Sequence, residues 1–464
     1  MIQLIATFVC VSGVLGLFFL DSNRGARVSK ALWIPVIWMM IVSSRQVSVW
    51  LHPNDAGSDI SRFTEGHPLD AAIYGSLILA ALLVLNYRSR MVEEFLRINA
   101  VLLAFFAYCA VSVLWSDFPI VALKREVKGI GTLAMALVVL TDPNPITAIR
   151  KFFSWTAFIL LPVSVLLIYF YPNLGTSFDA YNKSTYYIGV TTQKNSLGVT
   201  CMVCGLASLW SFLCAYQGRS VRYRHRSMVA HGLTFATAVW LLKICDSITS
   251  VSCLAIAACV LWLAAKSWVA RKPRNVHMLV ASGVVLAVFA LFMDTSGVLL
   301  RLLGRNATLT GRTEIWAAVI SFNTNPLVGT GYESFWLGDR IQRVAEMIGY
   351  TGVAEAHNGY LELYVNLGWI GVVMLGVLLV NGYRNALTAL YRDALTGSLR
   401  IAFFTVGVIF SLSEAGFQMM TPIWLAFLLQ IMAVPPVLDP LKAGKAWIPP
   451  WSGSAPSPVQ RILQ

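Results

Sequence analysis

Apolar segments recur along almost the whole chain, and short polar stretches separate them. They lie near residues 1–20, 31–50, 70–86, 98–115, 127–140, 152–171, 196–216, 229–245, 250–265, 278–293 and 360–380. An α-helix of about 20 apolar residues crosses the hydrocarbon core of a bilayer. The pattern therefore predicts an all-α polytopic membrane protein. The first segment has no basic start and no small-residue cleavage site, so we expect a first span there and not a signal peptide.

The last apolar run, from Arg400 to Val434, is too long for one crossing, because at about 1.5 Å per residue it would extend about 50 Å. Ser411, Glu414 and Gly416 interrupt it. These residues predict a helical pair that turns between them. The expected total is then about 12 or 13 transmembrane helices.

The composition and the charge pattern agree with this class. Only 12% of the 464 residues are charged, against about 25% in a soluble domain. The net charge is +13, but the basic residues gather in alternate short loops, as membrane topology requires. We therefore expect no nucleic-acid partner. The basic loops are 24–30, 88–97, 150–151, 219–226, 266–274 and 384–400.

The positive-inside rule places these basic loops in the cytoplasm and the remaining loops outside. The long loop Asp294–Asn358 then faces the periplasm of a bacterial inner membrane. We expect transmembrane helices over 1–293, a periplasmic loop with short surface helices over 294–358 and C-terminal transmembrane helices over 359–434. The tail over 435–464 is rich in Pro, Ser and Gly, which predicts disorder.

Several cations lie in the outward-facing loops, where membrane topology disfavours them. Any single one of them can be explained by contact with lipid phosphates or with a loop carboxylate such as Glu314. As a set they favour a binding site for an anion at the outer surface. The set is Lys124, Arg125, Lys128, Lys183, Lys194, Arg301, Arg305, Arg312, Arg340 and Arg343.

Four outward-facing segments carry candidate chemistry. The first, Trp115–Pro119 followed by Lys124 and Arg125, ends one predicted span and begins the next. Lys194 and Asn195 begin a predicted helix, where free backbone N–H groups favour an anion; the alternative for Asn195 is simple capping. Arg312 follows a glycine in the long loop and predicts a short surface helix. His357 and Asn358 stand where the chain re-enters the membrane. The ordinary pKa of a histidine, about 6.5, leaves much of it neutral, so His357 is a candidate general base; capping or lipid contact is the alternative.

Other classes of chemistry have no support in the sequence. A phosphate-binding P-loop, a dinucleotide-binding glycine motif and a zinc-spaced cluster of Cys and His are all missing, so we expect neither a nucleotide-driven pump nor a bound cofactor or metal. No Asp-x-Asp pair occurs that would hold the metal of a sugar-nucleotide transferase.

At these same positions the sequence resembles the bacterial O-antigen ligase and polysaccharide polymerase family, especially its exopolysaccharide polymerase-like branch. The similar segments occur in the family's order over about 300 residues. They are Trp115–Pro119, Thr192–Gly198, Asp246–Ser250, Gly311–Trp316, Asn325–Tyr332, His357–Glu362 and Ser411–Glu414. The family often has His where Gln193 stands here.

The resemblance implies a metal-independent membrane glycosyltransferase with a GT-C-like fold. Its donor would be a glycan on undecaprenyl diphosphate, and its acceptor a glycan or a lipid within the membrane lipids. Matched to the family's motifs, the diphosphate ligands fall on Arg312, Lys194 and Arg125, with Asn358 and Glu414 as further substrate contacts. His357 would activate the acceptor hydroxyl.

Two rival functions stay open at this stage. A ligase would transfer a finished glycan to lipid A core, and the motifs do not separate it from a polymerase. A secondary transporter or a flippase for lipid-linked glycans would carry charged residues at the membrane midplane. Here the polar clusters lie at one surface, which favours an enzyme.

Overall fold

The computed structural model describes residues 1–22, 27–52, 66–179, 184–217, 221–292, 310–349 and 353–435. Nearly all of the predicted tail, from residue 436 onward, lies outside the described residues, as do residues 293–309 of the long loop. The elements before the first strand are α1 (Ile2–Leu20), η1 (Lys30–Leu32), α2 (Trp33–Val42), α3 (Val47–Leu51), α5 (Pro68–Tyr87), α6 (Ser89–Ile98), α7 (Ala100–Ser112), η3 (Val113–Trp115), α8 (Pro119–Leu140), α9 (Pro145–Phe170) and α10 (Pro172–Gly175).

The second half begins with two short strands, β1 (Thr176–Asp179) and β2 (Ser184–Tyr187), which pair antiparallel. The sequence pattern did not predict this hairpin, because it is short and polar. The helices that follow are α11 (Lys194–Tyr216), α12 (Val221–Cys245), α13 (Ile248–Ala264), α14 (Ser267–Ala270), α15 (Pro273–Phe292), α17 (Thr310–Ser321), α18 (Arg340–Ile348), α19 (Gly359–Arg392), α20 (Ala394–Phe410) and α21 (Pro422–Ile431).

The all-α polytopic architecture is confirmed. Within the described residues, six helices are long and apolar enough to cross a membrane: α1, α5, α9, α11, α12 and α19. A seventh is obtained if α6 and α7, which bend by 88° at their junction, form one span. This count is smaller than the 12 or 13 expected, because five further apolar helices have only 10–17 residues. The predicted span at 127–140 belongs to α8, whose first half carries four charged residues, 124–126 and 128.

The last apolar run divides as the sequence predicted. Helix α20 ends at Phe410 and α21 begins at Pro422, so the turn falls in the segment that contains Glu414. Helix α19 is broken at Gly368, whose φ of 64° and ψ of −167° are not helical. A side chain at Gly368 would lie 2.2 Å from the backbone of Leu327, so glycine permits the break to pack directly against the 325–331 turn.

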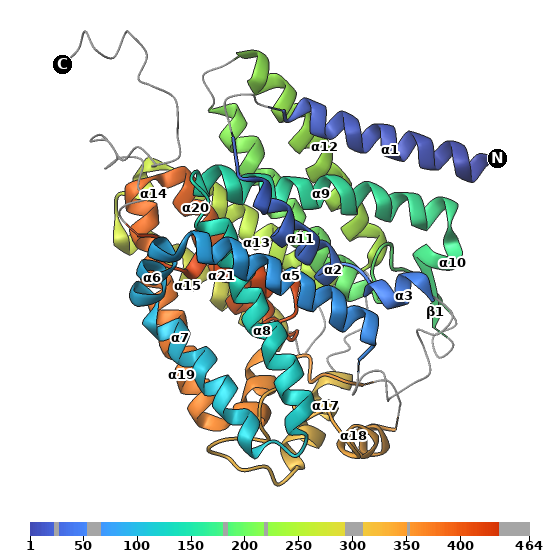
Figure 1. The fold of residues 1–464 in the computed structure, drawn as a ribbon, viewed down its shortest axis with the longest axis vertical. Coiled ribbons are helices and arrows are strands. Elements are labelled where there is room, and N and C mark those ends of the chain that lie inside the picture. The colour runs from blue at the N-terminus through green and yellow to red at the C-terminus, as the bar shows by residue number, and fades with distance from the viewer. Residues whose placement is uncertain are drawn as a thin grey trace.

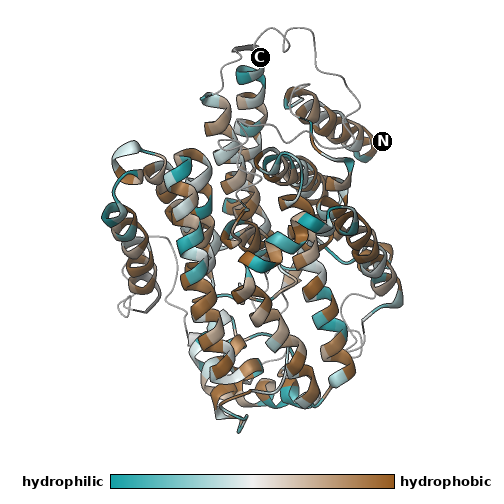
Figure 2. Ribbon diagram, turned by 60° about the vertical axis from the view of Figure 1, so that its left-hand side comes forward, coloured by the Kyte–Doolittle hydropathy of each residue, from teal (hydrophilic) through white to brown (hydrophobic). Residues whose placement is uncertain are grey.

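One large apolar core joins most of these helices. Helix α11 packs along α12, and α20 packs against both α13 and α19. Figure 1 shows α17 and α18 at one end of the molecule and α1 at the other. Figure 2 shows hydrophobic residues along most helices, with more hydrophilic residues at many of their ends and in the turns. A separate small core lies between α17, α18 and the start of α19, and it fixes the long loop's helices on the protein.

Candidate functional site

Two residues predicted from distant parts of the sequence, Arg312 and His357, both contact the carboxylate of a third, Glu414. Glu414 Oε1 accepts a hydrogen bond from Arg312 Nη2 at 2.7 Å, and Glu414 Oε2 lies 3.1 Å from His357 Nδ1. Glu355, which the sequence analysis did not single out, also contacts this imidazole nitrogen through Oε1 at 3.0 Å. Arg312 belongs to α17, and the other residues lie in turns beside α19 and α20. We call these four residues the Arg–His–Glu cluster.

The backbone brings the Glu414 turn against His357. The N–H of Gly359 donates to the carbonyls of Ser411, at 2.8 Å, and Glu414, at 3.0 Å. A side chain at Gly359 would lie 3.0 Å from Ser411 Cβ, so the two turns approach closely only with glycine here. His357 itself has a φ of 48°, a left-handed conformation that is uncommon for residues with a side chain and that often marks functional sites.

The charge state of His357 differs from the expectation of a largely neutral imidazole. Burial disfavours the charged imidazole, but hydrogen bonds and charge interactions with Glu355 and Glu414 outweigh it and raise the pKa of His357 to about 10. At neutral pH the imidazole is therefore protonated in this structure. This cluster therefore does not provide a neutral His357 that could accept a proton.

Asn358 and Glu362 hold the entrance of α19. The Asn358 side-chain oxygen accepts from the backbone N–H groups of Tyr360 and Leu361, both at 3.0 Å, so it caps the helix. Buried Glu362 accepts from Trp336 Nε1 at 2.9 Å and from the N–H of Ala356. These contacts explain a structural use for both residues, and substrate binding by Asn358 stays a prediction.

Lys194 begins α11, as predicted, with Gln193 as the residue before the helix. Its ammonium lies 4.2 Å from the centre of the Tyr186 ring, which comes from the unpredicted hairpin. Buried Arg45 donates to the carbonyls of Thr191, at 2.9 Å, and Gly189, at 3.2 Å. Arg45 therefore fixes the segment that leads into Lys194, a positioning role that its sequence context did not reveal.

A cavity of about 170 Å³ connects the start of α11 with the Arg–His–Glu cluster. Its lining includes Gln193, Asn195 and Ser196 beside the start of α11, and Glu355 and Glu414 from the cluster. Residues from the end of α2 and from the 415–423 segment also line the cavity. The cavity therefore joins two of the segments that carry the family resemblance.

The 246–250 segment supports the same helix. A side chain at Gly198 would lie 2.7 Å from Ser247 Cβ and 2.8 Å from Ser250 Oγ. Glycine in α11 thus lets the start of α13 pack closely against it. The similar segments 192–198 and 246–250 are neighbours in space.

Arg125 contacts the long loop at Glu333. Its guanidinium donates to the carbonyl of Glu333. The Glu333 side chain accepts from the backbone N–H of Met419, and burial raises the pKa of this carboxyl although Arg125 and Lys128 oppose the shift. The place of Arg125 in an anion site stays a prediction.

The segment 115–119 braces the long loop and does not enter the cluster. Trp115 Nε1 donates to the carbonyl of Val328 at 3.1 Å, and the hydroxyls of Ser116 and Ser334 lie 2.7 Å apart. Arg340 pairs with Asp117 at 2.8 Å. These contacts hold the 325–340 region on the ends of η3 and α8.

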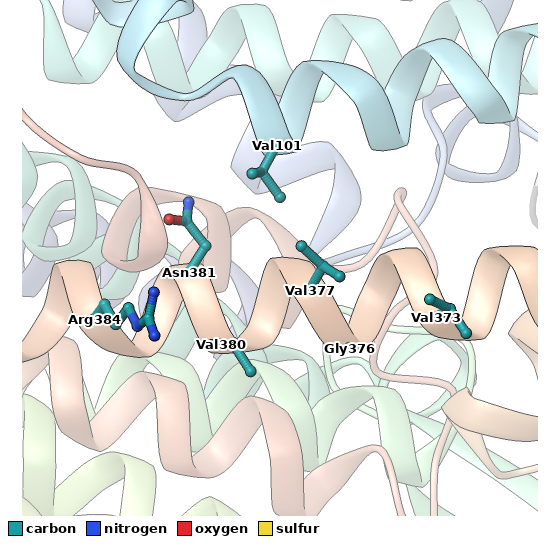
Figure 3. A pocket seen from close by; sticks show the side chains of 7 residues that line it. All are labelled: Val101, Val373, Gly376, Val377, Val380, Asn381 and Arg384. Carbon is teal, nitrogen blue, oxygen red and sulfur yellow. The ribbon is translucent and has the colours of Figure 1, made fainter.

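A second cavity and a possible ligand set complete the polar and hollow features of the described residues. A larger cavity of about 450 Å³ lies between α7 and α19 (Figure 3), but its described lining has one charged residue, Arg384, and no carboxylate or imidazole. The ligand atoms of Glu355, His357 and Glu414 all lie within 4.8 Å of one another, a set able to hold a metal ion. The expectation of a metal-free site therefore stays a prediction.

Comparisons with known proteins agree with these similar segments. A family model described as O-antigen ligase matches residues 233–376. The exopolysaccharide production protein ExoQ of Rhizobium meliloti (strain 1021) is 25% identical over 329 residues, which cover 69% of this chain and 72% of the relative. Together these matches show that the chain is similar to O-antigen ligase and exopolysaccharide production proteins.

Proposed function

We propose that this protein is a glycosyltransferase that polymerises or transfers undecaprenyl-diphosphate-linked glycans at the periplasmic face of the inner membrane. The family supports a membrane enzyme that ligates or polymerises glycans. The observation that carries the finer proposal is the Arg–His–Glu cluster. In it, Arg312 and His357 contact the same buried carboxylate, that of Glu414.

Arg312 is the proposed first ligand of the donor diphosphate. Its side chain is 22% exposed, so it remains accessible to an anion while Glu414 holds it in place. A guanidinium can form two parallel hydrogen bonds to a phosphate, and these strengthen as negative charge develops on the leaving group. Lys194 and Arg125 are proposed to contribute further positive charge to the same anion.

The acceptor proton is proposed to enter the cluster at Glu355. Both oxygens of Glu414 already have partners, Arg312 and His357. Glu355 contacts His357 through Oε1, and its side chain also lines the cavity. With the imidazole already protonated, a carboxylate is the group with a lone pair for another proton, and protonated His357 fixes its orientation.

The reaction then balances without a metal or a cofactor. The acceptor hydroxyl attacks the anomeric carbon of the donor glycan from the face opposite the diphosphate, and its proton passes to Glu355. The bond between the anomeric carbon and the diphosphate oxygen breaks. Undecaprenyl diphosphate leaves with the bonding electrons, and the new glycosidic bond has inverted configuration.

Two alternatives belong beside this proposal. An O-antigen ligase would use the same chemistry with lipid A core as the acceptor. A polytopic transporter or a lipid-linked glycan flippase would move the same donor without breaking its glycosidic bond. Release of undecaprenyl diphosphate distinguishes either transferase from transport.

Purified protein in liposomes that contain an undecaprenyl-diphosphate glycan and an acceptor glycan tests the proposal. We expect undecaprenyl diphosphate and a longer glycan to appear together. Arg312→Ala should abolish this product, whereas Arg343→Ala should not, because Arg343 is exposed on α18 and pairs with Asp339. Movement of intact donor across the bilayer without any product would overturn the proposal in favour of transport.

A further inference from the structure

The cavity between α11 and the Arg–His–Glu cluster has an unusual lining. Its polar side chains are hydroxyls, carboxamides and two carboxylates, and none of the described lining residues is Lys, Arg or His. Such a lining offers many hydrogen bonds to hydroxyl groups and no cation to an anionic group. The polar lining residues are Ser43, Ser44, Gln193, Asn195, Ser196, Thr200, Gln418, Thr421, Glu355 and Glu414.

One of these groups is buried without a partner. Ser43 is 2% exposed, and its Oγ has no hydrogen-bond partner among the described residues. A buried hydroxyl without a partner costs free energy, and Ser43 is one of the residues that line the cavity. The hydroxyl groups of a sugar can donate and accept such hydrogen bonds.

The charges around the cavity disfavour a second anion once the donor is bound. Glu355 and Glu414 face the cavity, and their charges are balanced by Arg312 and protonated His357. A bound diphosphate would pair with Arg312, so Arg312 would no longer balance the carboxylates and the site would have excess negative charge. An acceptor sugar that carries its own carboxylate would then be repelled.

We propose that this cavity holds the acceptor sugar and selects an uncharged sugar over one that carries a carboxylate. The inference rests on the proposed function, because it assigns the acceptor side of that reaction. Glu355, the proposed proton acceptor, lines the same cavity, so a sugar bound there places its hydroxyl beside the base.

Gln193 offers a direct way to change this selectivity. It lines the cavity and precedes α11 without making a side-chain capping hydrogen bond. Gln193→Lys would place a cation in the cavity wall. Gln217→Lys is the matched control, because Gln217 follows the opposite end of the same helix.

The test compares two synthetic acceptors that differ only in a terminal glucose or glucuronate. Wild-type protein should prefer the neutral acceptor by about tenfold in kcat/KM, which corresponds to about 1.4 kcal/mol. Gln193→Lys should reduce this preference severalfold, and Gln217→Lys should leave it unchanged. Equal use of both acceptors, or preference for glucuronate, would overturn the inference while leaving the transferase function intact. If neither acceptor is used and the donor is not cleaved, the result would count against the proposed function itself.

Ser43→Ala provides a second, independent readout. It removes a hydroxyl that has no partner in the described protein, so the fold loses no hydrogen bond. The KM for the neutral acceptor should rise severalfold with little change in kcat. Ser208→Ala removes another buried, unpartnered hydroxyl, but Ser208 does not line the cavity and its loss should not change KM. An unchanged KM in Ser43→Ala would contradict the assignment of the acceptor to this cavity.

Discussion

Glu355→Gln separates the proposed proton acceptor from the rest of the cluster. The substitution keeps the shape of the side chain and removes its charge. Glu355 and Glu414 contact the same His357 nitrogen at 3.0 and 3.1 Å. The difference between the ordinary pKa of 6.5 and the value of about 10 corresponds to roughly 5 kcal/mol. Because burial opposes both carboxylates, the loss of either negative charge should lower the pKa of His357.

The expected result is therefore twofold. The pKa of His357 should fall from about 10 toward the ordinary value of a histidine, because burial is then opposed by one carboxylate and not by two, and turnover should fall about a hundred- to ten-thousandfold. Nitrogen-15 NMR of labelled histidines in nanodiscs, with His357 assigned by substitution, measures the pKa. Glu346→Gln on the exposed face of α18 is the control. A His357 pKa that stays near 10 in Glu355→Gln, or near-normal turnover, would refute the reasoning.

Three further predictions follow from the same geometry. Arg312→Lys should lower turnover by about tenfold or more, measured as donor consumption, because an ammonium cannot reproduce the paired hydrogen bonds of a guanidinium; a rate near that of wild type would argue against the diphosphate role. Asn358→Ala should destabilise the start of α19 by about 1 kcal/mol, measured as a lower Tm, with a smaller effect on turnover; a large loss of turnover at unchanged Tm would instead indicate substrate contact. Single cysteines at Glu346 and Gln217, in a background without native cysteines, should react differently with an impermeant reagent on intact spheroplasts, Glu346 being labelled and Gln217 protected; the reverse pattern would overturn the topology.

Much of the architecture could be predicted from the apolar pattern, because burying about 20 apolar residues in a bilayer needs little long-range information. The turn at Glu414 was predicted for this reason. The described residues contain fewer full-length apolar helices than the pattern predicted, since apolar runs such as 31–50 end early. Helix α2 stops at Val42, where Ser43 and Arg45 begin a polar turn. Composition alone does not distinguish a short buried helix from a crossing one.

The site was predicted only in part, for a different reason. Arg312 and His357 were predicted from their positions in the long loop and Glu414 from the resemblance to a family, but their contact depends on the close packing of two turns at Gly359. Glu355 stands two residues before His357, whose backbone has the left-handed conformation. The sequence around a residue other than glycine does not reveal that its backbone is left-handed.

The charge of His357 could not be predicted either. The ordinary pKa applies to an isolated imidazole, whereas two carboxylates lie within 3.1 Å of this one. Charged neighbours at this distance determine which group is free to accept a proton. The proton acceptor in the proposed reaction therefore changes from His357 to Glu355, while His357 remains the group that organises it.

The most direct test of the account is the rate of glycan transfer by purified His357→Ala. Without the imidazolium, Glu355 and Glu414 lose the cation that holds them together, and the proposed reaction loses its organised proton acceptor. His277→Ala is the matched control, because His277 is exposed on α15 and pairs with the Tyr383 hydroxyl at 2.8 Å. We predict that His357→Ala retains less than about a hundredth of wild-type turnover, while His277→Ala stays near wild type and both proteins reach the membrane. Retention of more than about a tenth of wild-type turnover by His357→Ala would contradict the account.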